Sequence, residues 1–226
     1  MKRIFRWIRN IIIFFFVFSI LQVIIFKYIP VYFTPLMIIR CIEQKKEDKK
    51  IVWEHQWVSL DKISAYLPQA VVASEDNLFM DHSGFDFDQI EKAKKEAEKG
   101  KRQRGASTIT QQTAKNAFLW PGKSYIRKGL EAYYTVLVEL IWDKKRIMEV
   151  YLNSIEMGDG IYGAEAVAQN HFHKTAQNLS RNECAIIAAT LPNPRKFNSA
   201  KPSPYIEKRK NQIISLMGKI KPVDFE

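Results

Sequence analysis

Hydrophobic residues form one long run near the start of the chain and recur at helical spacing over much of the rest. The run IIIFFFVFSILQVIIF extends from Ile11 to Phe26, and only Ser19 and Gln22 interrupt it. With the apolar residues on either side it reaches the roughly 20 residues that a helix needs to cross a bilayer. This pattern predicts a transmembrane helix with a short basic tip over residues 1–27.

The charges before this run predict its orientation. The first positive side chains are Lys2, Arg3, Arg6 and Arg9, and no acidic residue precedes Glu43. Positive residues favour the cytoplasmic side. We therefore expect a single-pass signal-anchor in the inner (cytoplasmic) membrane, with the rest of the chain on the periplasmic side. A cleaved signal peptide is the alternative, and it is disfavoured because no small-x-small cleavage site follows the run.

Two short segments separate the anchor from the main domain. The stretch KYIPVYFTPLMIIR is bulky and aromatic, as in segments that lie at a membrane interface, and the charged connector EQKKEDKK follows it. We interpret residues 28–50 as an interfacial stalk and linker. Residues 51–226 show no break in composition and no internal repeat, so we expect them to form one domain.

The hydrophobic pattern of this domain is mainly helical. Apolar residues recur every three or four positions over residues 130–142, and a second such segment, Lys144–Asn153, precedes the glycine-rich MGDGIYG. Ser180 and Glu183 have the spacing of a capping box. Ile51–Val58 is the best strand candidate. The fold class predicted from these patterns is mainly α.

Composition and charge narrow the class of protein. A hydrophobic content of 46% excludes a disordered chain, and two cysteines cannot make a disulfide scaffold. The formal net charge of +11 favours anionic partners, namely nucleic acid, anionic lipid or a phosphorylated substrate. The predicted export argues against nucleic acid.

The first candidate site is SEDNLFMDHSGFD, which begins at Ser74. Glu75 follows an apolar run, and a carboxylate at the edge of an apolar element is partly desolvated. Desolvation raises its pKa toward the range that a general base needs at neutral pH. The alternative is that Glu75 and Asp76 begin a solvated turn and that His82 is a structural loop residue.

The second candidate is the polar segment RGASTITQQTAKN. Either Ser107 or Thr108 at its start can cap a helix. The helix then carries a stripe of hydrogen-bonding groups with one cation. Such groups suit sugar hydroxyls and acetamides, and a helix N-terminus with a cation suits phosphate. The alternative is the solvent-facing side of a surface helix. The candidate binding residues are Ser107, Thr108, Gln111, Gln112, Lys115 and Asn116.

The third candidate is RKGLE, in which Arg127, Lys128 and Glu131 share one helix face. In the functional interpretation the two cations hold a diphosphate and Glu131 orients them. A surface ion pair is the alternative. The run KKEAEKGKRQR is expected to be a solvated, mobile loop, and its Lys101 and Arg104 are further candidates for contact with an anionic substrate.

Other catalytic templates are not matched. PGKS at 121–124 lacks the upstream glycine of a phosphate-binding loop, and His171 and His173 are too close in sequence for a helical zinc pair. Cys184 lies in an apolar segment typical of a core. We predict no metal site built from protein ligands.

Five motifs occur in a fixed order along the chain. They are EDNLFMDHSGFD, RGASTITQQTAKN, RKGLE, KKRIMEVYLNSIEMGDGIYG and CAIIAATLPNPRKF. Together they resemble the motifs of the glycosyltransferase 51 family, the peptidoglycan polymerases, over about Trp57 to Phe197. The length, the single anchor and the missing second domain are similar to those of monofunctional members of that family.

The resemblance implies a lysozyme-like, bilobal transglycosylase domain whose smaller lobe inserts into the membrane surface. It implies polymerisation of lipid II, an undecaprenyl-diphosphate-linked disaccharide-pentapeptide, into β-1,4 glycan strands for the cell wall. By motif, Glu75 corresponds to the catalytic base and Glu131 to the second catalytic glutamate. Lys115, Arg127 and Lys128 correspond to positions that contact the diphosphate. The expected partners are lipid II, the growing glycan chain, membrane lipid and proteins of cell-wall synthesis or division.

The residues also favour a transferase on chemical grounds. Diphosphate is a good leaving group and needs cations, whereas an inverting hydrolase needs a second, protonated carboxylate. Arg127 and Lys128 are expected to keep Glu131 ionised, which suits it to orienting cations or Mg²⁺. Glu75 would then act as the general base in an inverting transfer that releases undecaprenyl diphosphate. The alternatives are a membrane-tethered lytic muramidase and a non-enzymatic basic module that binds wall polymer or anionic lipid.

Overall fold

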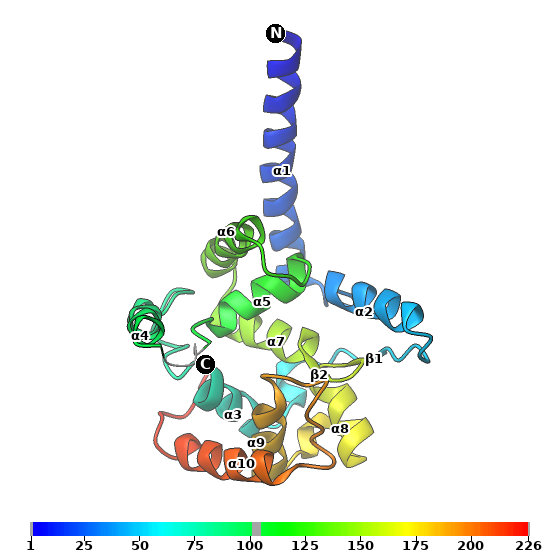
Figure 1. Cartoon of the computed structure of the whole chain (residues 1–226), viewed down its shortest axis with the longest axis vertical. Coiled ribbons are helices and arrows are strands. Elements are labelled where there is room, and N and C mark those ends of the chain that lie inside the picture. The colour runs from blue at the N-terminus through cyan, green and yellow to red at the C-terminus, as the bar shows by residue number, and fades with distance from the viewer. Residues whose placement is uncertain (1, 101–104, 226) are drawn as a thin grey trace.

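The computed structural model describes residues 2–100 and 105–225, and their fold is mainly helical, as the hydrophobic pattern predicts (Figure 1). The N-terminal helix α1 (Lys2–Tyr28) projects away from a body formed by the remaining elements. Its most apolar window has a mean hydropathy of 2.4. The helix is therefore long and apolar enough to cross a membrane.

The helix α2 (Pro35–Lys46) turns sideways at the base of α1 and is docked on the body (Figure 1). Met37 is completely buried. Gln44 accepts a hydrogen bond from the backbone N–H of Val52 at 2.7 Å and donates one to its carbonyl at 3.3 Å. These contacts hold α2 against the body.

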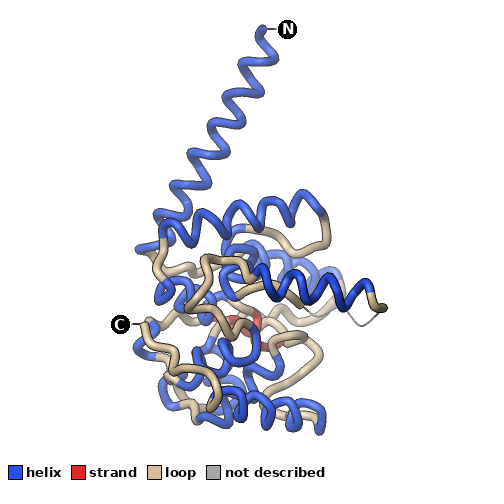
Figure 2. Tube along the Cα trace, turned by 90° about the vertical axis from the view of Figure 1, so that its left-hand side faces the viewer, coloured by secondary structure: helices blue, strands red, loops and turns tan. Residues whose placement is uncertain are grey.

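The body combines helices with one small sheet. Its helices are α3 (Tyr66–Glu75), α4 (Phe87–Glu98), α5 (Ile109–Phe118), α6 (Tyr125–Ile141), α7 (Lys144–Ser154), α8 (Ala164–Phe172), α9 (Arg181–Thr190) and α10 (Pro204–Met217), with 3₁₀ turns at Leu60–Lys62 and Ala176–Asn178. The strands β1 (Glu54–His55), β2 (Glu156–Gly158) and β3 (Ile161–Tyr162) form a sheet in the order β1–β3–β2. β1 is parallel to β3 and β2 is antiparallel to it, and Figure 2 shows the sheet among the helices.

The helices of the body form two groups with α7 between them (Figure 1). α3, α9 and α10 pack on one another in the part farthest from the free end of α1, whereas α5 packs on α6 and α7 near its base. Met148 and Tyr151 of α7 are completely buried in the common hydrophobic core. α7 therefore contributes to the core that the two groups share.

Side-chain contacts fix the second half of α1 to the body. The Ser19 hydroxyl is buried and lies 2.7 Å from the Tyr133 hydroxyl of α6. Arg146 of α7 donates to the carbonyl of Phe26 at 2.7 Å. Since backbone carbonyls at a helix C-terminus have no partner within the helix, Arg146 also caps α1.

The caps and periodicity predicted from the sequence are largely confirmed. The segment predicted over residues 130–142 is the larger part of α6, and the segment Lys144–Asn153 is α7. Ser180 and Glu183 form the predicted capping box at the start of α9.

Two local predictions were too broad. The predicted strand Ile51–Val58 is confined to Glu54–His55, because its partner β3 is only two residues long. The run from Lys94 that was expected to be a loop is helical as far as Glu98, where α4 ends.

Candidate active site

Glu75 is the last residue of α3, and its carboxylate meets α5. Its Oε2 accepts a hydrogen bond from Nε2 of Gln112 at 3.1 Å. Burial raises the pKa of Glu75, and the neighbouring Asp76 adds to the rise. The Gln112 hydrogen bond and the charges of Arg209 and Lys115 oppose it. A carboxylate whose pKa is raised by burial is suited to accept a proton near neutral pH.

Tyr151 of α7 orients the Gln112 side chain by a hydrogen bond to its oxygen. Tyr151 is completely buried, and its hydroxyl donates to Oε1 of Gln112 at 3.4 Å. With its oxygen engaged in this way, Gln112 presents its NH₂ group to Glu75. The position of the carboxylate therefore depends on the packing of three helices, α3, α5 and α7.

The start of α5 is tied to the residue after Glu75. Thr108 and Gln111 form a reciprocal capping box, in which Thr108 Oγ1 accepts from Gln111 N at 3.2 Å and Gln111 Oε1 accepts from Thr108 N at 3.0 Å. Asp76 accepts from the N–H of Ile109 at 2.9 Å. Thr108 and Gln111 are thus buried and hold the helix, and Asp76 joins the end of α3 to the start of α5.

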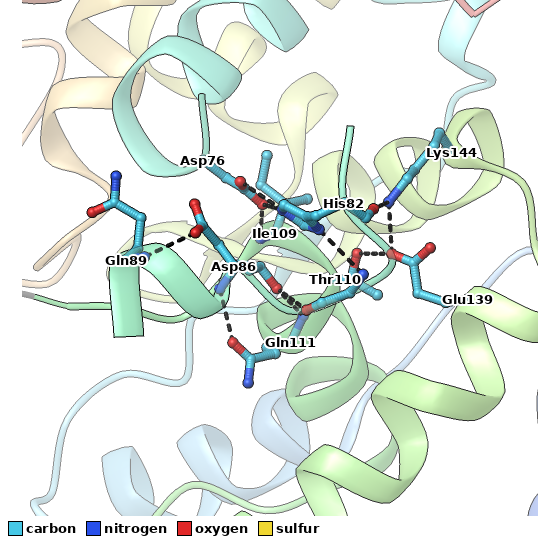
Figure 3. A network of polar contacts seen from close by, with 11 residues as sticks. Asp76, His82, Asp86, Gln89, Ile109, Thr110, Gln111, Glu139 and Lys144 are labelled. Carbon is cyan, nitrogen blue, oxygen red and sulfur yellow. Dashed lines mark hydrogen bonds and ion pairs between the residues drawn. The ribbon is translucent and has the colours of Figure 1, made fainter. Parts of the chain in front are cut away.

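A polar network behind Asp76 joins the loop after α3 to α6 and α7 (Figure 3). His82 Nδ1 accepts from the Gly84 N–H at 3.1 Å, so the ring proton lies on Nε2, which donates to Asp76 at 2.9 Å. Lys144 donates to the His82 carbonyl at 2.6 Å and to Glu139 at 2.8 Å. The hydrogen bonds of His82 therefore stabilise this loop.

The first turns of α6 carry two cations around one carboxylate. Arg127 Nη1 lies 2.6 Å from Glu131 Oε2, and Lys128 contacts Oε1 of the same carboxylate. Arg127 Nε also donates to the Gly122 carbonyl at 2.7 Å. Arg127 and Glu131 are buried, whereas the Lys128 side chain is 49% exposed. The three side chains share one helix face, with Lys128 open to a ligand.

Lys115 of α5 lies within electrostatic range of this cluster and of Glu75. Burial lowers the pKa of Lys115, Glu131 raises it, and Arg127 and Lys128 lower it further. The charge of Glu75 also raises it. A buried cation beside two others gains from a bound anion. Lys115, Arg127 and Lys128 are called here the cation cluster, and their role in binding an anion stays a prediction.

Glu75 also lines a cavity of about 350 Å³ between the end of α3, α4 and α10. None of the cation cluster is among the described residues that line it. Arg209 of α10 lies in this cavity, and its Nε is buried without a hydrogen-bond partner among the described residues. Arg209 was not predicted from the sequence, because α10 lies outside the five motifs and only the positive charge of this residue distinguishes it.

The remaining predicted site residues have distinct positions. Ser107 lines the cavity together with Thr108, and Asn116 is buried on α5. Lys101 and Arg104 lie outside the described residues.

The described residues do not fit a protein-held metal. No group of three or more His, Cys, Asp or Glu side chains among them is placed to hold one. Both oxygens of Glu131 are already paired, with Arg127 and Lys128. A divalent cation here would have to be held by oxygens of the ligand.

The chain is similar to known proteins over nearly its whole length. The family model described as Transglycosylase matches residues 44–218. A biosynthetic peptidoglycan transglycosylase of Bacteroides thetaiotaomicron is 61% identical over 226 residues, which cover 99% of this chain and 91% of that protein. Proteins of the same name from Bdellovibrio bacteriovorus and Caulobacter vibrioides are each 48% identical, over 93% and 96% of this chain and 84% and 93% of their own lengths.

These matches cover nearly the whole chain and include the segments that build the cavity and the cation cluster. The chain therefore belongs to the transglycosylase family and is a peptidoglycan glycosyltransferase.

Proposed function

We propose that this glycosyltransferase polymerises lipid II into β-1,4 glycan strands, with inversion at the anomeric carbon and with Glu75 as the general base. The observation that carries the proposal is the position of Glu75. It lines the 350 Å³ cavity and lies within electrostatic range of Lys115, a member of the cation cluster. One carboxylate thus stands between space for an acceptor sugar and a site for an anionic leaving group.

In the proposed reaction the acceptor sugar occupies the cavity beside Glu75. The carboxylate of Glu75 takes the proton of the acceptor 4-hydroxyl, and the hydroxyl oxygen attacks C1 of the donor sugar. The bond from C1 to the diphosphate oxygen breaks on the opposite face, so an α-linked diphosphate yields a β-1,4 bond. The raised pKa of Glu75 supports its role as proton acceptor.

The cation cluster would stabilise the departing diphosphate. Negative charge develops on this group as the C1–O bond breaks, and preorganised cations lower the energy of that state. Glu131 supports this role because it pairs with Arg127 and Lys128 and holds their side chains in place. Glu131 is thus proposed to orient cations, and no general acid is required.

The proposed substrates are lipids, which gives α1 a function. A membrane-spanning α1 would keep the enzyme in the inner membrane, with the body on the periplasmic side near lipid II and the growing chain. Proteins of cell-wall synthesis or division stay proposed partners. Mg²⁺ or another divalent cation stays a proposal too, as an ion carried by the substrate diphosphate.

The test is incubation of the purified full-length chain with labelled lipid II in detergent. Wild type and Glu75→Gln are run in parallel, with Mg²⁺ or with EDTA, and the products are separated on a gel beside a muramidase digest. We expect a wild-type ladder that muramidase collapses and that is missing with Glu75→Gln.

Three results bear on separate parts of the proposal. Near-normal polymerisation by Glu75→Gln would remove Glu75 as the base. Release of soluble fragments from finished cell wall, without a ladder from lipid II, would indicate a lytic enzyme. An equal ladder with EDTA and with Mg²⁺ would show that no divalent cation is needed.

A further inference from the structure

We infer that Arg209 is a positioning residue for the reaction: its cation keeps Glu75 in the ionised, proton-accepting form while a negatively charged substrate fills the site. This inference rests on the proposed role of Glu75 as general base. Arg209 lies on α10, far from Glu75 in the sequence, and the fold places both residues on one cavity.

Arg209 shares a cavity with the proposed base, and one nitrogen of its guanidinium group has no hydrogen-bond partner among the described residues. Arg209 and Glu75 line the same cavity, with Arg209 coming from α10 and Glu75 from the end of α3. Arg209 Nε is buried and has no hydrogen-bond partner among the described residues. An arginine held only for stability would normally satisfy such a buried donor. Among the carboxylates that line this cavity, Glu75 is the one whose ionised form the proposed reaction needs.

Other groups around Glu75 do not replace this cation. Gln112 from α5 is neutral, Tyr151 from α7 carries a hydroxyl, and Asp76 on the same segment has the same sign as Glu75. Lys115 from α5 has the right sign, but it also interacts with Glu131 and belongs to the site proposed for the leaving group. The α4 side of the cavity adds Asp86, Lys92 and Glu96, two carboxylates and one amine.

The charge matters because the substrate is an anion. Burial already raises the pKa of Glu75, and among the neighbouring charges Arg209 lowers it most. The diphosphate and peptide carboxylates of the proposed substrate add negative potential, which raises the pKa of a nearby carboxylate further. Without a local cation the base would be protonated, and inactive, over part of the neutral range.

Removal of the charge should therefore change the pH dependence of turnover. In Arg209→Gln we expect the acid limb of the kcat profile to move up by about one pH unit, as for a lost opposite charge nearby. Activity should recover at alkaline pH, and KM should change little. Arg209→Lys keeps the charge and should keep the wild-type limb.

The experiment measures kcat and KM for labelled lipid II from pH 5 to 9 with full-length protein in detergent. Lys208→Gln, an exposed change of the same charge on α10, is the matched control and should behave as wild type. The melting temperature of each variant is recorded to separate unfolding from titration.

Two results would overturn the inference. An unchanged acid limb with a raised KM in Arg209→Gln would make Arg209 a substrate contact. If Arg209→Lys folds and the acid limb of its kcat profile is shifted, the charge at position 209 is not what sets the limb. This result would count even if Arg209→Gln does not fold. Glu75→Gln, measured in parallel, tests the base itself. Activity there would defeat the proposed function whatever Arg209 does.

Discussion

The Tyr151 hydroxyl donates to the side-chain oxygen of Gln112 at 3.4 Å, and the amide of Gln112 donates to Glu75 at 3.1 Å. The orientation of the Gln112 amide is therefore decided by a residue that does not face the substrate. Its two ends differ in what they offer a carboxylate, because the NH₂ group attracts it and the oxygen repels it.

Tyr151→Phe should lower kcat several-fold and leave KM nearly unchanged. Without the hydroxyl, Gln112 is free to turn its oxygen toward Glu75, while the buried ring still fills its space. The lost hydrogen bond should cost about 1 kcal/mol of unfolding free energy. Kinetics on lipid II check the split between kcat and KM, with Tyr205→Phe on the surface as control. An unchanged kcat would show that Gln112 needs no support.

Glu75→Gln should be more stable than wild type at neutral pH. Burial raises the pKa of Glu75 above its ordinary value of 4.5, so the native state holds this proton to a higher pH than the unfolded chain does. The stability that protonation contributes is complete below about pH 4.5 and is lost as the pH rises through the native pKa. The neutral amide avoids this loss.

The pH dependence of melting tests this relation. The melting temperature of Glu75→Gln should exceed that of wild type at pH 7.5, and the difference should narrow as the pH falls toward 4.5. A difference that stays constant over this range would instead point to new contacts made by the amide.

Glu131→Gln should destabilise the body by about 3 kcal/mol. The change leaves the buried Arg127 guanidinium without its carboxylate, and breaking one side of a buried ion pair is costly. Glu207→Gln is the matched control, because its pair with Lys210 is partly exposed and should matter by less than about 1 kcal/mol. Urea unfolding of both variants measures the contrast, and equal losses would contradict a buried pair.

Gly84→Ala should cost about 1–3 kcal/mol of unfolding free energy. Gly84 has φ of +85°, and an added Cβ would lie 2.8 Å from Thr135 Cγ2 and 2.9 Å from Glu139 Cγ. Strain and overlap act together at this position. Gly129→Ala, in the exposed face of α6 with nothing within 4 Å, should instead stabilise the protein by up to about 1 kcal/mol. A neutral Gly84→Ala variant would show that the loop adjusts.

Ser19→Leu should slow polymerisation several-fold in liposomes. Ser19 is completely buried, and the larger side chain would displace the Tyr133 hydroxyl that lies 2.7 Å away. Because Tyr133 lies on α6, the displacement would move the helix that carries Arg127 and Lys128 of the cation cluster. Val17→Leu adds a methylene on an exposed part of α1 and should have no effect. Equal rates for the two variants would mean that α1 is only a tether.

Local features of the site could be predicted from the sequence. Arg127, Lys128 and Glu131 share a helix face because their spacing alone determines it, and the structure has them in contact. Either Ser107 or Thr108 was expected to cap α5, and the structure selects Thr108, since only its register gives the reciprocal bond with Gln111. Signals of this kind depend on a few consecutive residues.

Tertiary relations in the site could not be predicted in this way. Arg209 reaches the cavity because α10 packs on α3 and α9, and Tyr151 reaches Gln112 because α7 packs on α5. Neither residue has a periodic or capping signal that points to Glu75. The capping role of Gln111 was also missed, because a polar stripe on a helix is the same in sequence whether it meets solvent or its own N-terminus.

The attachment of α1 to the body has a geometric consequence for a membrane-bound enzyme. Trp142 donates to the carbonyl of Val23 at 2.8 Å, and Arg146 to that of Phe26 at 2.7 Å. If α1 spans the bilayer along the membrane normal, these bonds fix the height of the catalytic centre above the membrane surface and its tilt. A molecule anchored in this way would keep lateral diffusion and rotation about the membrane normal, so its search for the proposed lipid substrate would be two-dimensional and at constant height.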